Sequence, residues 1–163
     1  MLSRIFSNEP PPPEEPSNLN APIYNNGAFM PFQQAFTPEA LDQAYNTLRT
    51  TGISGVKLTE GLFGNLGMFF MLVAGQGEPL YLAALLRHKG RAHAMGPSLP
   101  HMAAAASSAG CLSVLGAYGN PLNQHIPGSQ DSPATPPPLF YAAQTCNLAL
   151  LQVLATYNAI HTV

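Results

Sequence analysis

Charged side chains are scarce in this sequence of 163 residues. Aspartate, glutamate, lysine and arginine make up 9% of it, against roughly 25% in an average soluble protein. A lone soluble domain with so little charge tends to aggregate, so we expect much of the surface to face lipid or protein. The charge is also uneven, because nine of the fourteen charged residues lie in 1–60 and one, Asp131, lies in 92–163. The sequence therefore predicts a polar arm followed by an apolar body.

Cations, tryptophan and cysteine are few as well. The chain has six lysines and arginines, a net charge of −2 and no tryptophan. A groove that follows a phosphate backbone needs many more cations, so we do not expect nucleic acid as a partner. The two cysteines are too few and too far apart in the sequence for a zinc site or a disulfide framework.

Sequence motifs that carry chemistry are also missing. There is no glycine-rich phosphate loop, no G-x-S-x-G turn and no H-E-x-x-H helix. None of the five histidines stands at ligand spacing from a second histidine, a cysteine or an acid. His101, near a predicted helix start, is the one weak candidate for a haem or quinone contact. We therefore predict a protein that is not an enzyme and holds no metal or cofactor, apart from bound lipids.

Residues 1–36 predict an extended arm rich in proline and asparagine. The four prolines of 10–13 favour the polyproline II conformation. Aromatic residues such as Tyr24 and Phe29 are spaced along the arm, which indicates a strap that lies on a partner's surface; the alternative is a flexible tail. The first seven residues contain Arg4, two serines and no acid. This pattern resembles the opening of a mitochondrial targeting segment.

Residues 37–52 predict a short amphipathic helix. Thr37 can cap it, Pro38 suits its first position, and Glu39 complements the helix dipole. Its apolar face has the spacing i, i+3, i+4 and i+7, and consists of Leu41, Ala44, Tyr45 and Leu48. Gly52 is placed to end the helix.

Residues 53–163 predict a membrane domain. The uncharged stretches 61–77, 99–119 and 139–160 are its candidate transmembrane helices. About 20 apolar residues are needed to cross a bilayer, so 61–77 is at the short end and 139–160 is the best candidate. The predicted fold is an all-α membrane protein with two or three short transmembrane helices after the arm and the amphipathic helix.

Small residues within the candidate spans predict close approach between helices. The helix-packing positions are Gly61, Gly64, Gly67, Ala106, Gly110 and Gly116. Cys111 and Cys146 can lie at the same depth if the last two spans form an antiparallel hairpin. The sequence leaves open either a disulfide between them or two buried free thiols, which are commoner in membrane helices.

One stretch resembles a small four-helix membrane family of unknown function with a G-A-x-G-A-H-G signature. The resemblance is carried by residues 108–119 (SAGCLSVLGAYG), 140–143 (FYAA) and 147–151 (NLALL). It implies two paired membrane helices within 107–155. The family's histidines fall at Pro121 and Asn147 here, and its other two helices have no counterpart. The wider pattern of strap, capped helix and glycine- and alanine-rich spans resembles lineage-specific accessory subunits of respiratory or photosynthetic complexes.

The function predicted from these features is that of a non-catalytic accessory subunit in a mitochondrial inner-membrane respiratory complex. Its partners are the other subunits and the lipid bilayer. The first alternative is a peripheral subunit of a thylakoid photosystem. A second is a small independent transporter or channel, and a third is a soluble all-α binding protein.

Overall fold

Short helices joined in pairs form the body of the protein. The computed structural model describes residues 15–16, 18–25, 27–59, 65–89, 98–123 and 137–157. Two helices, α2 (Phe32–Ala35) and α3 (Pro38–Thr50), precede three helical hairpins. The hairpins are α4 (Leu66–Gly75) with α5 (Pro79–Lys89), α6 (Ser98–Ala105) with α7 (Ala109–Ala117), and α8 (Pro138–Gln144) with α9 (Leu148–Thr156).

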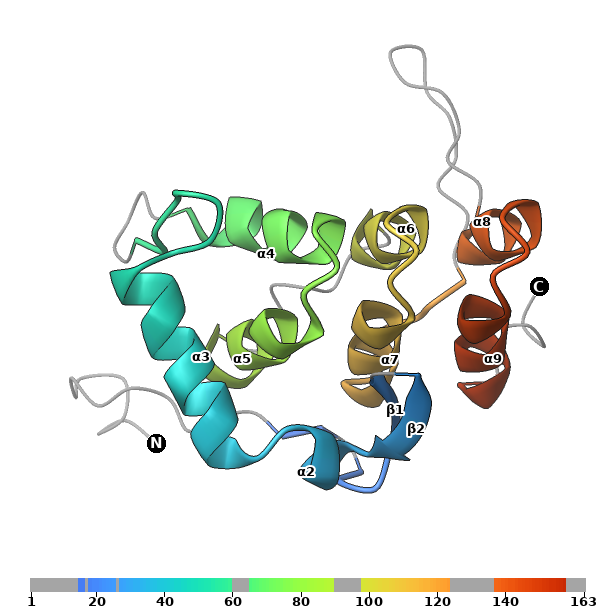
Figure 1. Ribbon diagram of the computed structural model, residues 1–163, viewed down its shortest axis with the longest axis horizontal. Coiled ribbons are helices and arrows are strands. Elements are labelled where there is room, and N and C mark those ends of the chain that lie inside the picture. Colours follow the sequence, from blue (N-terminus) through green and yellow to red (C-terminus); the bar gives the residue numbers. More distant parts are fainter. Residues whose placement is uncertain are drawn as a thin grey trace, which may run out of the picture.

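The hairpins stack side by side into two rows of helices (Figure 1). The first helices α4, α6 and α8 form one row, in which each contacts the next. The second helices α5, α7 and α9 form the other row, and α3 extends that row by packing against α5. The result is a short two-layered array in which hairpins contact their neighbours, as in solenoid proteins.

The same turn joins the two helices of each hairpin. The first helix of each hairpin ends in a Schellman motif, which contains one residue in the left-handed conformation. The residue after it donates its backbone N–H to the carbonyl of the residue five positions earlier in the chain. The left-handed residues are Gly77 (φ 71°), Ser107 (φ 58°) and Cys146 (φ 53°). The closing hydrogen bonds run from Glu78 N to Val73 O, from Ser108 N to Ala103 O, and from Asn147 N to Ala142 O.

Side chains then start the second helix in two of the three hairpins. The Ser108 hydroxyl accepts a hydrogen bond from the backbone N–H of Cys111, and the Asn147 amide oxygen accepts one from that of Leu150. Serine and asparagine are favoured at this position because they satisfy a backbone donor that the helix leaves free. Local chemistry therefore turns the chain at these points, inside runs that are otherwise apolar.

The core runs between the two rows and repeats from hairpin to hairpin. Counted from the left-handed residue, the positions at −4, +7 and +8 are fully buried in all three hairpins. They are Val73, Ala84 and Leu85 in the first, Ala103, Val114 and Leu115 in the second, and Ala142, Val153 and Leu154 in the third. The helices are therefore held by apolar contacts with one another.

The amphipathic helix expected over 37–52 corresponds to α3. The Thr37 hydroxyl accepts a hydrogen bond from Ala40 N at 3.3 Å, and Pro38 occupies the first position. The buried side chains of α3 are Leu41, Ala44 and Leu48, which pack into the core. Gly52, with φ 79°, follows the helix. The apolar face of α3 packs against α5 of the same chain.

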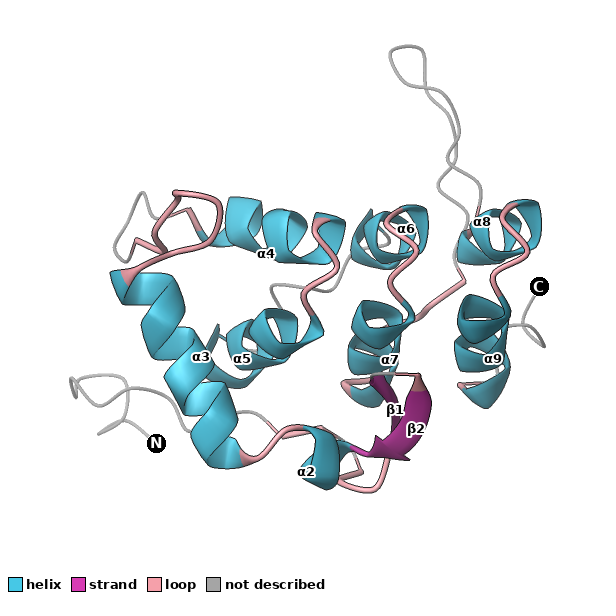
Figure 2. Ribbon diagram, viewed as in Figure 1, coloured by secondary structure: helices cyan, strands magenta, loops and turns pink. Residues whose placement is uncertain are grey.

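Part of the N-terminal arm folds back onto the body as a β-hairpin. Strands β1 (Pro22–Asn25) and β2 (Ala28–Pro31) are antiparallel, and β1 packs against α7 (Figure 2). Tyr24 N donates to the Ser113 hydroxyl, and the Tyr157 hydroxyl donates to Pro22 O. Ile23 is fully buried. The pockets that receive these arm side chains therefore belong to the chain's own helices.

The predicted membrane fold is wrong. Within the described ranges, no helix is both long and apolar enough to cross a bilayer. In the candidate span 61–77, the described helix α4 is ten residues long. The spans 99–119 and 139–160 are each divided into two helices by a left-handed residue. The structure is instead mostly helical, with one small two-stranded sheet.

Candidate partner-binding surfaces

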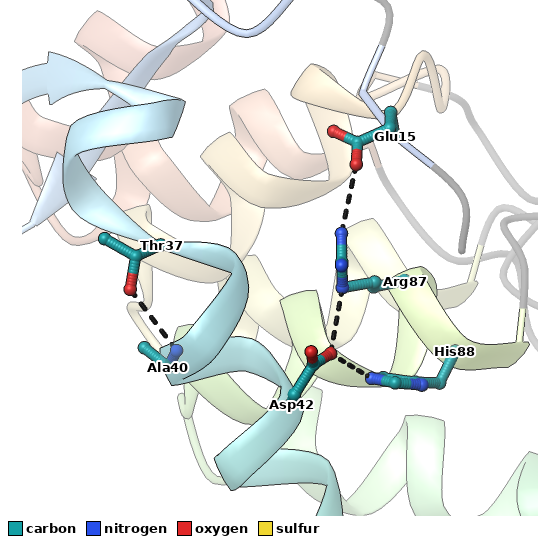
Figure 3. A network of polar contacts seen from close by, with 6 residues as sticks. All are labelled: Glu15, Thr37, Ala40, Asp42, Arg87 and His88. Atoms are coloured by element: carbon teal, nitrogen blue, oxygen red, sulfur yellow. Dashed lines mark hydrogen bonds and ion pairs between the residues drawn. The ribbon is translucent and has the colours of Figure 1, made fainter. Parts of the chain in front are cut away.

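A polar network on the surface joins the arm, α3 and α5 (Figure 3). Arg87 on α5 donates from Nη1 to Glu15 Oε1 at 3.0 Å and from Nε to Asp42 Oδ1 at 3.1 Å. His88 donates from Nε2 to the same Asp42 oxygen at 2.7 Å. Two carboxylates from distant parts of the sequence thus meet one guanidinium group, which can bind both because of its forked donors.

This network shifts the pKa values of its members. Burial disfavours the charged form of Asp42, but hydrogen bonds from Arg87 and His88 outweigh it and lower the pKa of Asp42 below its ordinary value. Burial likewise opposes the charge on Arg87, but hydrogen bonds to Asp42 and Glu15 raise its pKa. Both shifts favour the ionised pair, so the network holds α3 to α5 at neutral pH.

An aromatic contact supports the same junction. The rings of Tyr45 on α3 and His88 on α5 are stacked, with centroids 4.2 Å apart and planes inclined by 12°. The cations of Arg49 and Lys89 lie 5.9 and 5.8 Å from the centre of the Tyr45 ring. These are distances at which cations are attracted to an aromatic face. The arrangement acts as a clamp between helices.

A cavity of about 790 Å³, here called the arm pocket, lies beside this network. Its apolar wall is formed by Leu19, Phe32, Phe36 and Leu41, and its polar wall by Glu15, Gln33 and Arg87. Pockets of this size with few polar groups are typical of small-molecule sites. An acidic molecule in this pocket would compete with Glu15 for the guanidinium group of Arg87.

Large apolar side chains are exposed on α4 and, at the other end of the array, on α8 and α9. Met68 and Met71, three residues apart on α4, are 49% and 51% exposed and form the α4 patch. Phe140 on α8 is 49% exposed, and Leu148 at the start of α9 is 77% exposed. A contiguous exposed apolar patch is a feature by which surfaces that contact other proteins are recognised.

The predicted helix-packing residues occupy different environments. A Cβ atom on Gly110 would lie 3.0 Å from Pro79 and 3.1 Å from Tyr24 O, so neighbouring elements approach closely there. Gly116 makes a still closer approach to Tyr157. A Cβ atom on Gly67 would have nothing within 4 Å. Ala106 is exposed in the turn after α6, and Gly61 and Gly64 lie outside the described residues.

The predicted cysteine and histidine sites are separate. Both cysteines are free thiols, so they form no disulfide: Cys111 is buried in α7, and Cys146 is exposed in the third turn. Burial raises the pKa of the Cys111 thiol to about 12. His101 is buried on α6. Among the described residues, no cluster of three or more histidine, cysteine or acidic side chains is placed to hold a metal ion.

Sequence reasoning missed the arm pocket and the polar network. In the sequence, Arg87, Glu15 and Asp42 belong to no common motif and lie far apart. Their meeting depends on how the arm and α3 pack onto α5, for which no local signal exists. The repeated turn did leave a signal, because Gly77, Ser107 and Cys146 are each followed by a polar residue and then by a second apolar helix.

Comparisons with known proteins provide no relative. No family model, curated protein or solved structure matches the chain. Its function must therefore be inferred from the repeated hairpins and from the surfaces described above.

Proposed function

We propose that this chain is a non-catalytic module that binds another protein and has its place in a larger assembly. The observation that carries the proposal is the repetition of one helical hairpin three times, with the same turn and the same buried positions. Arrays of stacked hairpins present extended surfaces, and they bind partners on those surfaces. The polar network and the aromatic clamp hold helices together in this array, which fits a structural role for them.

The hairpins are similar in size and layout to ankyrin-type repeats. Such repeats contain two helices, have a period of about 33 residues and open with the pattern T-P-L-H-x-A. The left-handed residues of the present hairpins are 30 and 39 residues apart. The α6 helix opens with Ser98-Leu-Pro-His101-Met-Ala103, which has a histidine and an alanine at the corresponding places. This likeness in layout favours a binding module of the ankyrin type.

The α4 patch is the proposed contact for the partner. Methionine side chains are flexible and polarisable, and they are common on surfaces that adapt to a partner. Met68 and Met71 lie on one face of α4, three residues apart, and each is about half exposed. A partner with an apolar helix face or an apolar loop would remove both side chains from water, which stabilises the complex.

The accessory role predicted from the sequence is retained in this proposal, without membrane-spanning helices. The compartment stays a prediction that rests on the first seven residues, whose pattern resembles a mitochondrial targeting segment. We propose a respiratory complex as the assembly that contains this chain, with a photosystem as the alternative. Both assignments predict that the chain co-migrates with a large complex.

The test uses tagged full-length chain in its own cells, solubilised under mild conditions. Native electrophoresis with mass spectrometry should place the wild-type chain in an assembly of several hundred kilodaltons. Met71→Glu should reduce the fraction in that assembly at least fivefold, because it puts a charge into the apolar contact. Thr50→Glu, on the exposed side of α3, is the control and should leave the fraction unchanged. Migration of the wild-type chain by itself, without other proteins, would contradict the proposal.

A second candidate function is binding of a small acidic molecule in the arm pocket. The observation that favours it is the guanidinium group of Arg87 at the edge of an apolar wall. Isothermal titration with decanoate tests it, with Glu15→Gln as the informative variant. The variant should bind more tightly than the wild type, because the internal carboxylate no longer competes for Arg87. Absence of binding by both proteins would remove this candidate.

A further inference from the structure

We propose that the arm pocket binds a monocarboxylic acid with an apolar body, and that this ligand takes the place of Glu15 and Pro16 of the arm. The exchange rests on the second candidate function, the binding of a small acidic molecule. It adds to that function the class of the acid and the response of the arm. Two observations carry it: the separate contacts of Arg87 with its two carboxylates, and the unequal exposure of the pocket walls.

The two walls of the arm pocket differ in how firmly the fold holds them. The body side, here called the core wall, consists of Phe32, Phe36 and Leu41, which are 3%, 4% and 2% exposed. On the arm side, Leu19 is 44% exposed and the side chain of Glu15 is 55% exposed. The core wall therefore belongs to the hydrophobic core, and the arm side is the wall that a ligand can displace.

Arg87 binds its two carboxylates through different groups. Its Nε donates to Asp42 at 3.1 Å and its Nη1 to Glu15 at 3.0 Å, and the two acids approach from different directions (Figure 3). Asp42 also accepts a hydrogen bond from His88 at 2.7 Å, whereas within the described ranges Glu15 is paired with Arg87 alone. Exposed ion pairs contribute little to stability. Glu15 is therefore the carboxylate that another acid can replace while Asp42 remains bound.

Glu15 and Pro16 indicate which kind of molecule the pocket accepts. The carboxylate of Glu15 lies on Arg87, and the next residue, Pro16, is buried and lines the pocket. A carboxylate beside an apolar ring thus already occupies this place. An acid with an apolar body offers the same two contacts, and burial of that body against the core wall removes apolar surface from water.

Asp42 limits the charge of the ligand. Because Asp42 stays on the same guanidinium group, an acid bound there faces a second negative charge. A carboxylate brings one charge, and its two oxygens match the forked donors of Arg87. A phosphate monoester carries about −1.5 to −2 at pH 7, so Asp42 repels it more strongly. The site therefore favours a monocarboxylate over a phosphate.

The adjoining turn of the arm has its own attachment to the body. The backbone N–H of Gln33 donates to Leu19 O at 2.9 Å, and Gln33 Nε2 donates to Asn20 Oδ1 at 2.7 Å. These hydrogen bonds do not involve the guanidinium group. Exchange of carboxylates at that group therefore releases Glu15 and Pro16 and leaves the turn in place.

The experiment is a titration of the purified, ¹⁵N-labelled full-length chain with decanoate, followed by NMR. The heteronuclear NOE of the Glu15 amide, which reports backbone rigidity, should fall as decanoate binds, and that of Asn20 should stay unchanged. 1-Decanol has the same apolar body without a charge, so it should bind about tenfold more weakly and leave the Glu15 amide unchanged. Decyl phosphate should also bind more weakly than decanoate.

Glu15→Gln is the informative variant. Without ligand, the amide of residue 15 should already have a lower NOE than in the wild type, because the ion pair with Arg87 is lost. Decanoate should then cause little further change at this amide. Glu78→Gln is the matched control, since it removes the same charge just before α5, whereas Arg87 lies near the other end of that helix. This control should behave like the wild type.

The outcomes separate the exchange from the candidate function beneath it. Decanoate binding that leaves the Glu15 amide of the wild type unchanged would overturn the exchange and leave the second candidate function intact. Absence of decanoate binding by both the wild type and Glu15→Gln would overturn both. Equal rigidity of residue 15 in the two ligand-free proteins would show that the ion pair does not hold the arm, and would overturn the release. Tighter binding of decyl phosphate than of decanoate would overturn the assignment of a monocarboxylate.

Discussion

Gly116 on α7 faces the ring of Tyr157 across the contact between the second and third hairpins. A Cβ atom at residue 116 would lie 2.8 Å from Cγ and 2.9 Å from Cδ2 of that ring. Carbon atoms repel one another at such distances, since their optimal separation is about 3.5–4.0 Å. The missing side chain at residue 116 therefore sets how closely the third hairpin can pack.

Gly116→Ala should lower the free energy of unfolding by about 1–3 kcal/mol, the usual effect of overpacking a core. The matched control is Gly67→Ala in α4, where an added Cβ atom meets nothing within 4 Å. That variant should be unchanged or more stable by about 0.5 kcal/mol, because alanine favours a helix over glycine. Urea denaturation measures both. Equal effects of the two substitutions would argue against the close contact at residue 116.

In the second turn, at Ser107, a substitution should instead raise the free energy of unfolding. Ser107 has φ 58°, a conformation that glycine adopts without strain. Ser107→Gly should therefore raise the free energy of unfolding by about 0.5–1 kcal/mol. Ala106→Gly, at the exposed preceding residue, should lower the free energy of unfolding by a similar amount. Glycine at residue 106 only adds conformational freedom to the unfolded chain, which favours unfolding. If residues 99–119 formed one continuous helix, both substitutions would be destabilising.

These turns explain why the sequence predicted α3 well and the remaining helices poorly. Thr37, Pro38 and Glu39 are standard signals for a helix start, and α3 begins at Pro38. The third turn has Cys146 at its left-handed position, a residue type that carries no turn signal. The apolar runs through Ser107 and Cys146 therefore read as continuous spans. A search for repeats with a period of 30–40 residues is the approach that detects such arrays.

The binding surfaces depend on information that a local sequence pattern does not contain. Leu148 and its equivalent Ala109 are similar apolar residues at the start of a second helix. Leu148 is 77% exposed and Ala109 is buried, so the surroundings of each residue in the fold decide its exposure. The meeting of Glu15 with Arg87, 72 residues apart, likewise depends on the fold of the arm. Composition predicted that much of the surface would face lipid or protein, and this stays a prediction; the exposed apolar side chains of α4, α8 and α9 are where it can be tested.

The junction between α3 and α5 should weaken in acid. The pKa of Asp42 is lowered in the folded chain, so its stabilising effect is present above its unfolded value and is lost as the pH falls through the folded value. The wild type should therefore lose stability below about pH 4. Asp42→Asn should reduce this loss, because the substituted side chain no longer titrates. Urea denaturation at pH 6 and pH 3 makes the comparison; equal pH dependence in the wild type and Asp42→Asn would contradict the assignment.

The two thiols should differ in reactivity. Cys146 is exposed, whereas Cys111 is buried and its pKa is raised to about 12. Because the thiolate is the reactive form, iodoacetamide at pH 8 should modify Cys146 in the native chain and Cys111 only after unfolding. Peptide mass spectrometry identifies the labelled residue. Rapid labelling of Cys111 in the native chain, or a disulfide between the two, would be inconsistent with the packing of α7.

The most direct test of the hairpin array is the distance between residues 140 and 155. Spin labels at Phe140→Cys and Ala155→Cys, with Cys111 and Cys146 replaced by alanine and serine, are measured by dipolar coupling in an excess of unlabelled chain. A hairpin of α8 and α9 brings the two backbones to about 10 Å, the spacing of packed helices. A continuous helix through residue 146 separates them by about 22 Å. The shorter distance is the predicted result, and the longer one would contradict the three-hairpin architecture.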